Sequence, residues 1–337
     1  MDTTKLTTKD IAKLAGVSPA AVSFAINGRK GISDQTRKRI LEIVAQTNYR
    51  PMGGTKEPHR ENIAILFRHD IPTLDQLFYT ELNASMIAAC DQLPYTLILT
   101  SAYHQGNEII LSDVLRSGSI DGVITYGDLE RDVQSELNNL GIPIVVLDSS
   151  RKSEEQFAVR VDYAMAAYTA AKHLIDLGHR DIAYIGNDKL HDFNLLTFSG
   201  FQRATTEHSL PLDMNRIQIN VYDEESLYIC IDEALKGECA PTALFCATDF
   251  YAIHAIRHLH SKGMRVPDDI SVVGIDDIAV SKFIIPSLTT VRIDREAMGR
   301  YGFELMKRCL NNESRECISL PSSNLIVRES TAPPRRI

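Results

Sequence analysis

Three carboxylates follow segments that are predicted to be strands. Asp148 and Asp276 come directly after the apolar segments Ile144–Leu147 and Ser271–Ile275, and Asp162 ends a third segment. Ligands of α/β proteins bind beyond the carboxyl ends of the strands. Carboxylates in that place accept paired hydrogen bonds from sugar hydroxyls or from amines. They also cap the helices that follow, and for Asp162 both roles are equally supported.

Other reactive residue types show no catalytic or metal-binding pattern. His254 and His258 are spaced i, i+4 beside His260, but no further ligand completes a metal site, so a surface or dimer-facing helix is favoured. The six cysteines lack CxxC or zinc-ligand spacing and are interpreted as reduced cytoplasmic thiols. Neither a Ser-His-Asp motif nor a phosphate loop of the GxGxxG type occurs. We therefore predict a protein that is not an enzyme and has no cofactor or metal.

The stretch Thr7–Asn27 predicts two short helices joined by a tight turn. Thr7 is a candidate N-cap, and Gly16 can end the first helix in a left-handed conformation. Ser18 and Pro19 then suit the cap and first position of a second helix. The pair forms either a helix-turn-helix, whose second helix fits the DNA major groove, or a hairpin inside a helical bundle. The apolar face of the first helix is predicted at Ile11, Ala12, Leu14 and Ala15.

Positive charge is concentrated in the N-terminal part. Residues 1–60 carry 11 Lys and Arg against 5 Asp and Glu, a net charge of +6, which leaves −14 for the rest. A third helix is predicted from Asp34 to Thr47, with Ser33 as its cap. It carries three cations near its start that belong either to a solvated face or to phosphate contacts: Arg37, Lys38 and Arg39. This charge distribution suggests that the head binds a polyanion.

Residues 52–60, MGGTKEPHR, are predicted to be a linker. From Asn62 onward, short apolar runs alternate with helical patterns, which indicates an α/β body with two parallel sheets. The predicted strands are Ile63–Phe67, Thr96–Thr100, Gly122–Thr125, Ile144–Leu147, Ile182–Ile185, Ile217–Val221, Ala243–Cys246 and Ser271–Ile275. The predicted helices include Phe78–Leu93, Tyr163–Leu177, Phe250–Lys262 and Arg295–Leu310. With no membrane-length apolar run and no signal-peptide core, we predict a cytoplasmic protein without a membrane partner.

Six motifs follow one another along the chain: DIAKLAGVSPAAVSFAIN, TRKRILEIVAQTNYRP, HLIDLGHRDIAYIG, VPDDISVVGIDD, PSLTTV and VRESTAPP. In this order they resemble the LacI/GalR (lactose-repressor/galactose-repressor) family of bacterial transcription regulators. The resemblance implies a helix-turn-helix head (1–51), the linker (52–60), a periplasmic-binding-protein-like body (61–333) and a tail (334–337). The first lobe of the body would hold about 61–161 and 293–320, and the second about 162–291 and 322–333.

For the head, the resemblance implies a set of DNA contacts. The positions that match family residues in contact with phosphates or beside them are Thr7, Ser18, Ser23, Asn27, Thr36 and Tyr49. Ala21, Arg29 and Lys30 are further predicted DNA-binding residues. The base-reading positions fall on Pro19, Ala20 and Phe24, where many relatives have Arg in place of Phe24. Pro19 and Ala20 cannot form bidentate base contacts, whereas Ala20 and Phe24 can touch thymine methyls, unless Phe24 packs inward. We expect operator recognition to depend partly on A·T content and DNA shape.

For the body, the resemblance implies an effector cleft. Asp276 matches a ligand-contacting carboxylate, while Phe78 and Tyr79 match an aromatic wall that suits a sugar or a base, or else pack in the core. Thr197 and Thr248 stand where many relatives have Arg and Asn. Losing that arginine disfavours an anionic effector, so a neutral sugar is predicted, with a nucleoside second. The remaining predicted cleft residues are Asp148, Asp162, His191 and Phe193, with Arg68 as a further cation.

The implied function is a DNA-binding regulator, a repressor acting as a homodimer on a double-stranded operator, whose affinity a small effector changes. A transporter's solute-binding protein is opposed by the basic head and the missing signal peptide. A sugar-modifying enzyme is opposed by the absence of a nucleophile and base.

The linker generates the first prediction. Relatives carry here an Asn- and Ala-rich helix with a leucine that kinks the operator, but this chain has Gly53, Gly54 and Pro58. Each glycine disfavours helix by about 1 kcal/mol and an interior proline by about 3 kcal/mol. We therefore expect a weak or absent central kink in a circular-permutation assay of the bound operator. A strong central kink would contradict this expectation.

Overall fold

The computed structural model contains two compact units, Met1–Arg60 and Glu61–Ile337, which are described separately. Residues 52–60, the predicted linker, lie outside the described residues. The structure describes residues 8–26, 32–47, 61–68, 76–91, 93–105, 108–149, 156–187, 191–237, 240–321 and 324–335.

The head consists of α1 (Thr8–Ala15), α2 (Pro19–Ile26) and α3 (Asp34–Gln46), as predicted. Gly16 ends α1 with φ +64°, and the Ser18 hydroxyl accepts a hydrogen bond from the Ala21 amide at 3.2 Å. The core contains Ile11, Ala12, Ala15, Val22, Ala25 and Ile40.

One prediction for the head is wrong, because Leu14 is 54% exposed. At about 100° per residue, Ile11, Ala12 and Ala15 share one arc of α1, and Leu14 lies outside it.

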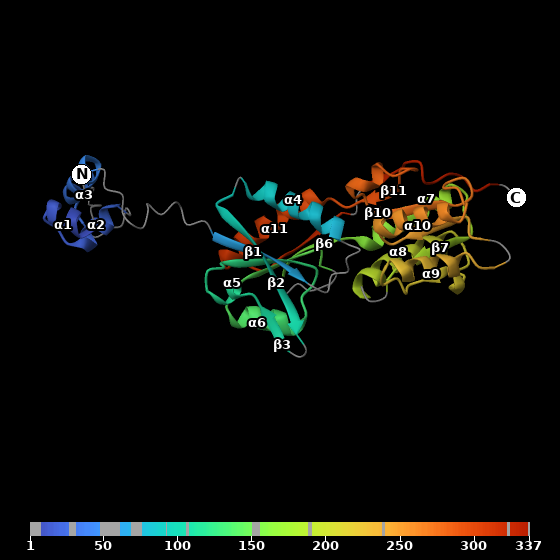
Figure 1. The fold of residues 1–337 in the computed structure, drawn as a ribbon, viewed down its shortest axis with the longest axis horizontal. Coiled ribbons are helices and arrows are strands. Elements are labelled where there is room, and N and C mark those ends of the chain that lie inside the picture. The colour runs from blue at the N-terminus through green and yellow to red at the C-terminus, as the bar shows by residue number, and fades with distance from the viewer. Residues whose placement is uncertain are drawn as a thin grey trace. The chain divides into compact units, whose positions relative to one another are not determined.

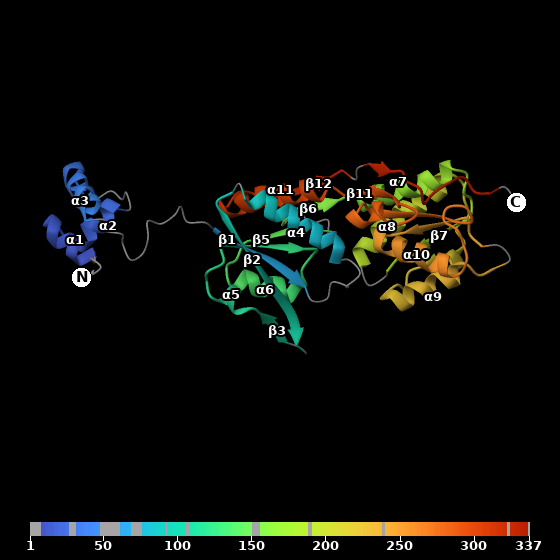
Figure 2. The same cartoon turned by 45° about the horizontal axis from the view of Figure 1, so that its top comes forward.

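The first sheet of the body has the strand order β12-β6-β5-β4-β1-β2-β3, and only the β2–β3 pair is antiparallel. α4 (Gln76–Cys90) and α11 (Arg295–Leu310) lie side by side on one face, and α5 (Asp113–Arg116) and α6 (Arg131–Asn139) cover the other (Figures 1 and 2). Its strands are β1 (Glu61–Arg68), β2 (Tyr95–Gln105), β3 (Glu108–Leu111), β4 (Gly122–Tyr126), β5 (Ile144–Leu147), β6 (Phe157–Val161) and β12 (Cys317–Leu320).

The second sheet has the order β13-β11-β10-β9-β7-β8, and only the β11–β13 pair is antiparallel. α7 (Tyr163–Asp176) packs on α8 (His191–Glu207), while α9 (Glu224–Ala234) packs on α10 (Asp249–Ser261). The strands are β7 (Ile182–Ile185), β8 (Ile217–Gln218), β9 (Ala243–Cys246), β10 (Ser271–Asp276), β11 (Thr289–Arg292) and β13 (Leu325–Ile326), and short helices η2 (Met214–Arg216) and η3 (Ala279–Lys282) complete this lobe.

The chain passes between the sheets three times, after β6, after β11 and after β12. We call the part around the first sheet the first lobe and the part around the second sheet the second lobe. Buried side chains of both lobes join in one continuous hydrophobic cluster. The lobes are therefore packed against each other and share their core.

The strand predictions are confirmed with one correction. β8 is much shorter than the predicted Ile217–Val221, and beyond it only Asn220 pairs, with Asn187. β4 and β10 are wholly buried, which explains their continuous apolar sequence in parallel sheets. Gly200 of α8 allows close packing on α7, because a Cβ there would lie 2.0 Å from the Ala164 carbonyl oxygen.

Candidate functional site

The N-termini of α2 and α3 carry two of the predicted phosphate-contact residues, Ser18 and Thr36. Ser18 caps α2, and the Ser33 hydroxyl caps α3 by accepting the Thr36 amide at 3.2 Å, while the Thr36 hydroxyl lies 2.8 Å from that of Ser33. Helix N-termini present amides and a positive dipole end, which suit phosphate groups.

The reading surface of α2 is largely apolar where it is described. Pro19 is exposed and Phe24 half-buried, whereas Val22 and Ala25 are buried in the head. Phe24 is thus accessible at least in part, and the packing interpretation does not account for all of its surface. For Ala20 and Ser23 only the backbone is described, and the predicted contacts that lie outside the described residues are Thr7, Asn27, Arg29, Lys30 and Tyr49.

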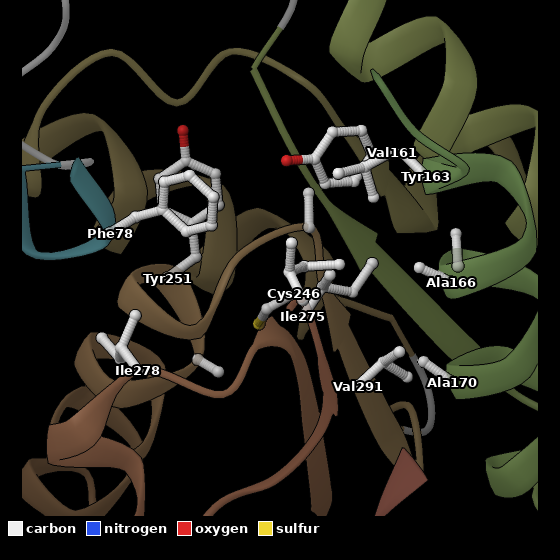
Figure 3. Close-up of a cluster of buried hydrophobic side chains, with 14 of the residues drawn as sticks. Phe78, Val161, Tyr163, Ala166, Ala170, Cys246, Tyr251, Ile275, Ile278 and Val291 are labelled. Carbon is white, nitrogen blue, oxygen red and sulfur yellow. The ribbon is translucent and has the colours of Figure 1, made fainter. Parts of the chain in front are cut away.

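Aromatic rings line the first lobe where it meets the second. Tyr79 of α4 stacks on Tyr126 at 5.3 Å between ring centroids, and the Tyr126 hydroxyl donates to Asn83 Oδ1 at 2.5 Å. Phe78 is only 6% exposed and meets Tyr79 edge to face at 5.3 Å. Figure 3 shows Phe78 within the same cluster as Tyr163 and Tyr251 of the second lobe. Phe78 therefore contributes to core packing, and Tyr79 is the more accessible ring.

Asp148 lies at the centre of this region. It follows β5 with φ +59°. Its Oδ1 accepts a hydrogen bond from the Tyr163 hydroxyl at 2.7 Å, and its carboxylate accepts another from the Tyr79 hydroxyl. Burial raises the pKa of the Asp148 carboxyl to about 6, although both phenol hydrogen bonds oppose this shift. Phe193 of α8 packs against the Tyr163 ring at 4.7 Å. Asp148, Tyr79, Tyr163 and Phe193 thus form one cluster.

Asp276 approaches the same cluster from the end of β10. It is 7% exposed, and its charge raises the pKa of Tyr163, after burial and Asp148. Asp276 and Asp277 have φ values of +128° and +53°, which side chains rarely adopt. Asp277 is held by Arg292 at 2.7 Å and by Arg328 at 2.5 Å. These ion pairs stabilise the bend that points Asp276 at the cluster.

The other predicted cleft residues have different environments. Asp162 is exposed and accepts the Met165 amide at 2.9 Å, so the predicted capping contact is present. Thr248 caps α10 through the Tyr251 amide at 3.3 Å. Thr197 is fully buried, and its hydroxyl lies 2.9 Å from that of Tyr184 inside the second lobe. The side chains of His191 and Arg68 lie outside the described part of the structure.

A polar latch joins the lobes beside this cluster. The Glu81 carboxylate of α4 accepts one hydrogen bond from the Ala279 amide at 2.6 Å and forms an ion pair with the Arg295 guanidinium at 2.7 Å. Arg295 also donates to the carbonyls of Asp276 at 2.6 Å and Asp277 at 2.8 Å, and its guanidinium lies 5.4 Å from the Phe78 ring centroid. We call this group the latch: Glu81, Arg295 and the Ala279 amide. The sequence did not identify it, because a glutamate within a helix and an arginine at a helix start are usually surface residues.

Asp249 is a second residue that the sequence does not single out. It is fully buried, and its Oδ2 accepts hydrogen bonds from the Ile278 amide at 3.0 Å and the Ser281 hydroxyl at 2.6 Å, while Oδ1 accepts from Thr290. Burial raises the pKa of this carboxyl to about 7. Asp249 therefore fixes the loop that carries the Ala279 amide of the latch.

The histidines of α10 have structural partners. His258 lies 2.8 Å from an Asp232 oxygen and stacks on Tyr228, and His254 stacks on Phe250. In the ranges given above, no group of three or more His, Cys, Asp or Glu side chains is placed to hold a metal. No helix there has both the length and the apolar character needed to cross a membrane.

Comparison with known proteins identifies the family. Residues 7–52 match the model of bacterial regulatory proteins of the lacI family, and residues 171–331 match a periplasmic binding protein-like domain. The transcriptional repressor PurR of Actinobacillus pleuropneumoniae serotype 3 (strain JL03) is 30% identical over 298 residues, which cover 87% of this chain and 88% of PurR. The chain belongs to the lacI family. The predicted family and fold class are confirmed.

Other lacI-family proteins are similar over most of their length. Catabolite control protein A of Priestia megaterium is 28% identical over 92% of this chain and 94% of its own. A LacI-family regulator from Enterococcus faecium with bound ribose is 27% identical, with a TM-score of 0.70, over 82% of this chain and all of that one. The CelR–cellobiose complex is 25% identical, with a TM-score of 0.67, over 96% and 99%. This lacI-family chain is therefore a DNA-binding repressor of transcription and not an enzyme.

The Asp148 environment predicts a pH-dependent stability. Its pKa of about 6 lies above its ordinary value of 3.8, so between these two pH values the folded protein holds a proton there that the unfolded chain has lost. This stabilising contribution is complete below about pH 4 and is lost as the pH rises through 6. Asp148→Asn removes the titration, so relative to wild type its free energy of unfolding in urea should rise by about 1 kcal/mol between pH 5 and pH 8. A difference that is equal at both pH values would contradict this.

Proposed function

We propose that this repressor binds its operator as a homodimer through α2, and that a neutral sugar bound between the lobes changes its operator affinity. The observation that carries the effector proposal is the cluster of Asp148, Asp276, Tyr79 and Tyr163. A nucleoside is the second candidate, because the half-buried ring of Tyr79, which is stacked on the buried ring of Tyr126, suits stacking with a base.

The chemistry of the cluster supports a hydroxyl-rich ligand. Two carboxylates from different lobes can accept hydrogen bonds from hydroxyl groups, and the half-buried ring of Tyr79 offers apolar surface beside them. Thr197, which replaces the arginine of many relatives, is turned into the second lobe, and Arg295 is bonded to Glu81 and to backbone carbonyls. Among the described side chains, these contacts leave no cation directed at the cluster for an anionic effector. The bound ribose and cellobiose of the two similar proteins agree with this chemistry.

Exposed apolar side chains support the homodimer. Phe283 and Ile285, which follow η3, are 72% and 86% exposed, and Leu99 of β2 is 61% exposed. Contiguous exposed apolar side chains are typical of association surfaces, and Phe283 and Ile285 lie two residues apart in the chain. A second copy of the chain would cover them.

The proposed coupling is a two-state rearrangement of the lobes. The latch and the Tyr163–Asp148 hydrogen bond hold one arrangement, and an effector favours one arrangement only if it binds the two with different affinity. The chain passes between the lobes three times, so a rotation of one lobe moves all three connections together. In a dimer, this rotation would change the relation of the two heads.

The test begins with selection of duplexes from random DNA by the full-length protein. Operator affinity is then measured by fluorescence anisotropy on the selected duplex and on an unrelated duplex of equal length, with panels of neutral sugars, nucleosides and sugar phosphates. We expect tight, selective binding that a neutral sugar changes by about fivefold or more. A nucleoside response would favour the second candidate, and a response to anions alone would contradict both.

The variant Asp276→Asn tests whether the Asp276 carboxylate belongs to the proposed sugar site. The variant keeps the shape of the side chain, but it replaces one accepting carboxylate oxygen with an NH2 group and removes the negative charge. Hydrogen bonds from sugar hydroxyls to this side chain therefore become fewer and weaker. We expect its sugar affinity, measured by calorimetry, to fall by about tenfold or more, as is typical when a charged hydrogen bond is lost. Its operator affinity without sugar should stay close to wild type, and an unchanged sugar affinity would remove Asp276 from the site.

A further inference from the structure

The recognition helix α2 depends on its surroundings for its orientation. It is only eight residues long, and helices this short are not stable alone. Val22 and Ala25 anchor one side of it in the head, with exposed fractions of 0% and 4%. Because Pro19, Ala20 and Phe24 offer few hydrogen bonds to bases, recognition by this helix relies on where it is placed against the groove.

The C-terminal turn of α2 is held by a residue from another helix. The last carbonyls of a helix lack partners within it, and α2 has no basic residue in its last turn. Arg37 of α3 supplies that charge: its Nη1 donates to the carbonyls of Phe24 at 3.2 Å and Ala25 at 3.3 Å. A cation at a helix C-terminus is stabilising, and hydrogen bonds from a guanidinium are stronger than neutral ones.

The two neighbours of Arg37 are in a different environment. Arg37 is half-buried, whereas Lys38 and Arg39 are exposed on α3. At the other end of α2, the Ser18 hydroxyl accepts the Ala21 amide. Both ends of α2 are therefore fixed, and because Arg37 holds the backbone of Phe24, it also fixes the place from which the Phe24 side chain leaves the helix.

We infer that Arg37 is a positioning residue for DNA reading, which fixes the C-terminal turn of α2 and Phe24 against α3 instead of neutralising a phosphate. The inference rests on the proposed function, since it requires α2 to read the operator. It also divides the three cations of α3 into one with an internal role and two exposed candidates for phosphate contacts. A positioning residue and a phosphate contact can be told apart by the salt dependence of DNA affinity. Each phosphate contact that is lost lowers the slope of log affinity against log salt concentration by about 1.

The experiment uses the full-length protein, the duplex selected by wild type and an unrelated duplex of equal length, each over a series of salt concentrations. The variants are Arg37→Met, which keeps the apolar stem, and Arg37→Lys, which keeps the charge; Lys38→Met is the matched control. For Arg37→Met we expect affinity for the selected duplex to fall by about tenfold, with an unchanged salt slope and unchanged affinity for unrelated DNA. Arg37→Lys should recover part of the selectivity. If Lys38 contacts a phosphate, its variant should weaken binding to both duplexes alike and lower the slope.

Two results would overturn the inference. One is that Arg37→Met lowers the salt slope by about 1 and reduces affinity equally for both duplexes, because that result would identify Arg37 as a phosphate contact. The other is an Arg37→Met protein with wild-type selectivity. If circular dichroism shows that the head of Arg37→Met is unfolded, Arg37→Lys decides, and wild-type selectivity in that folded variant would also overturn the inference. Failure of wild type itself to discriminate the duplexes would instead refute the proposed function.

Discussion

The arrangement of the two lobes depends most on one guanidinium, that of Arg295. This residue lies at the start of α11, just after the chain passes from β11 of the second lobe into the first lobe. It pairs with Glu81 of the first lobe and donates to the carbonyls of Asp276 and Asp277 in the second. Arg295 is mostly buried, with 12% of its side chain exposed, so breaking this arrangement would leave a charge without its partners in a poorly hydrated site. The relation of the two lobes is therefore tied to the position of Arg295.

The same contacts couple the lobes to the cluster that we propose as the effector site. Arg295 holds the backbone of Asp276, whose carboxylate approaches Tyr163, and Tyr163 bonds to Asp148 of the first lobe. A ligand that donates hydrogen bonds to the Asp148 carboxylate must displace those that the hydroxyls of Tyr163 and Tyr79 donate to it. Ligand entry and lobe arrangement thus compete for the same few groups, as expected where an effector shifts a conformational equilibrium.

Much of this architecture is predictable from the sequence, because long apolar runs and helix caps are local signals. β10 and the Ser18 cap of α2 follow directly from Ser271–Ile275 and Ser18-Pro19. β11 and β12 were not among the predicted strands, since their short sequences TTVR and CISL carry polar residues, and β6 was predicted only through its end at Asp162. β12 acquires its pairing from β6, a strand distant in sequence. In the cleft, the strand-end carboxylates were identified by position, whereas Glu81 and Arg295 meet only after folding. The inward orientation of Thr197 is likewise set by tertiary packing around Tyr184.

The central claim is that the arrangement of the lobes sets operator affinity, and Glu81→Gln tests it most directly. This variant removes the carboxylate of the latch without replacing any residue of the head or the cluster. Glu304→Gln, at an exposed position of α11, removes an equal charge without that contact. Affinity for the selected duplex should change by about fivefold or more for Glu81→Gln, the usual size of coupling between sites, and stay at the wild-type value for Glu304→Gln. A folded Glu81→Gln protein with wild-type operator affinity, and with the same response to effector, would contradict the account.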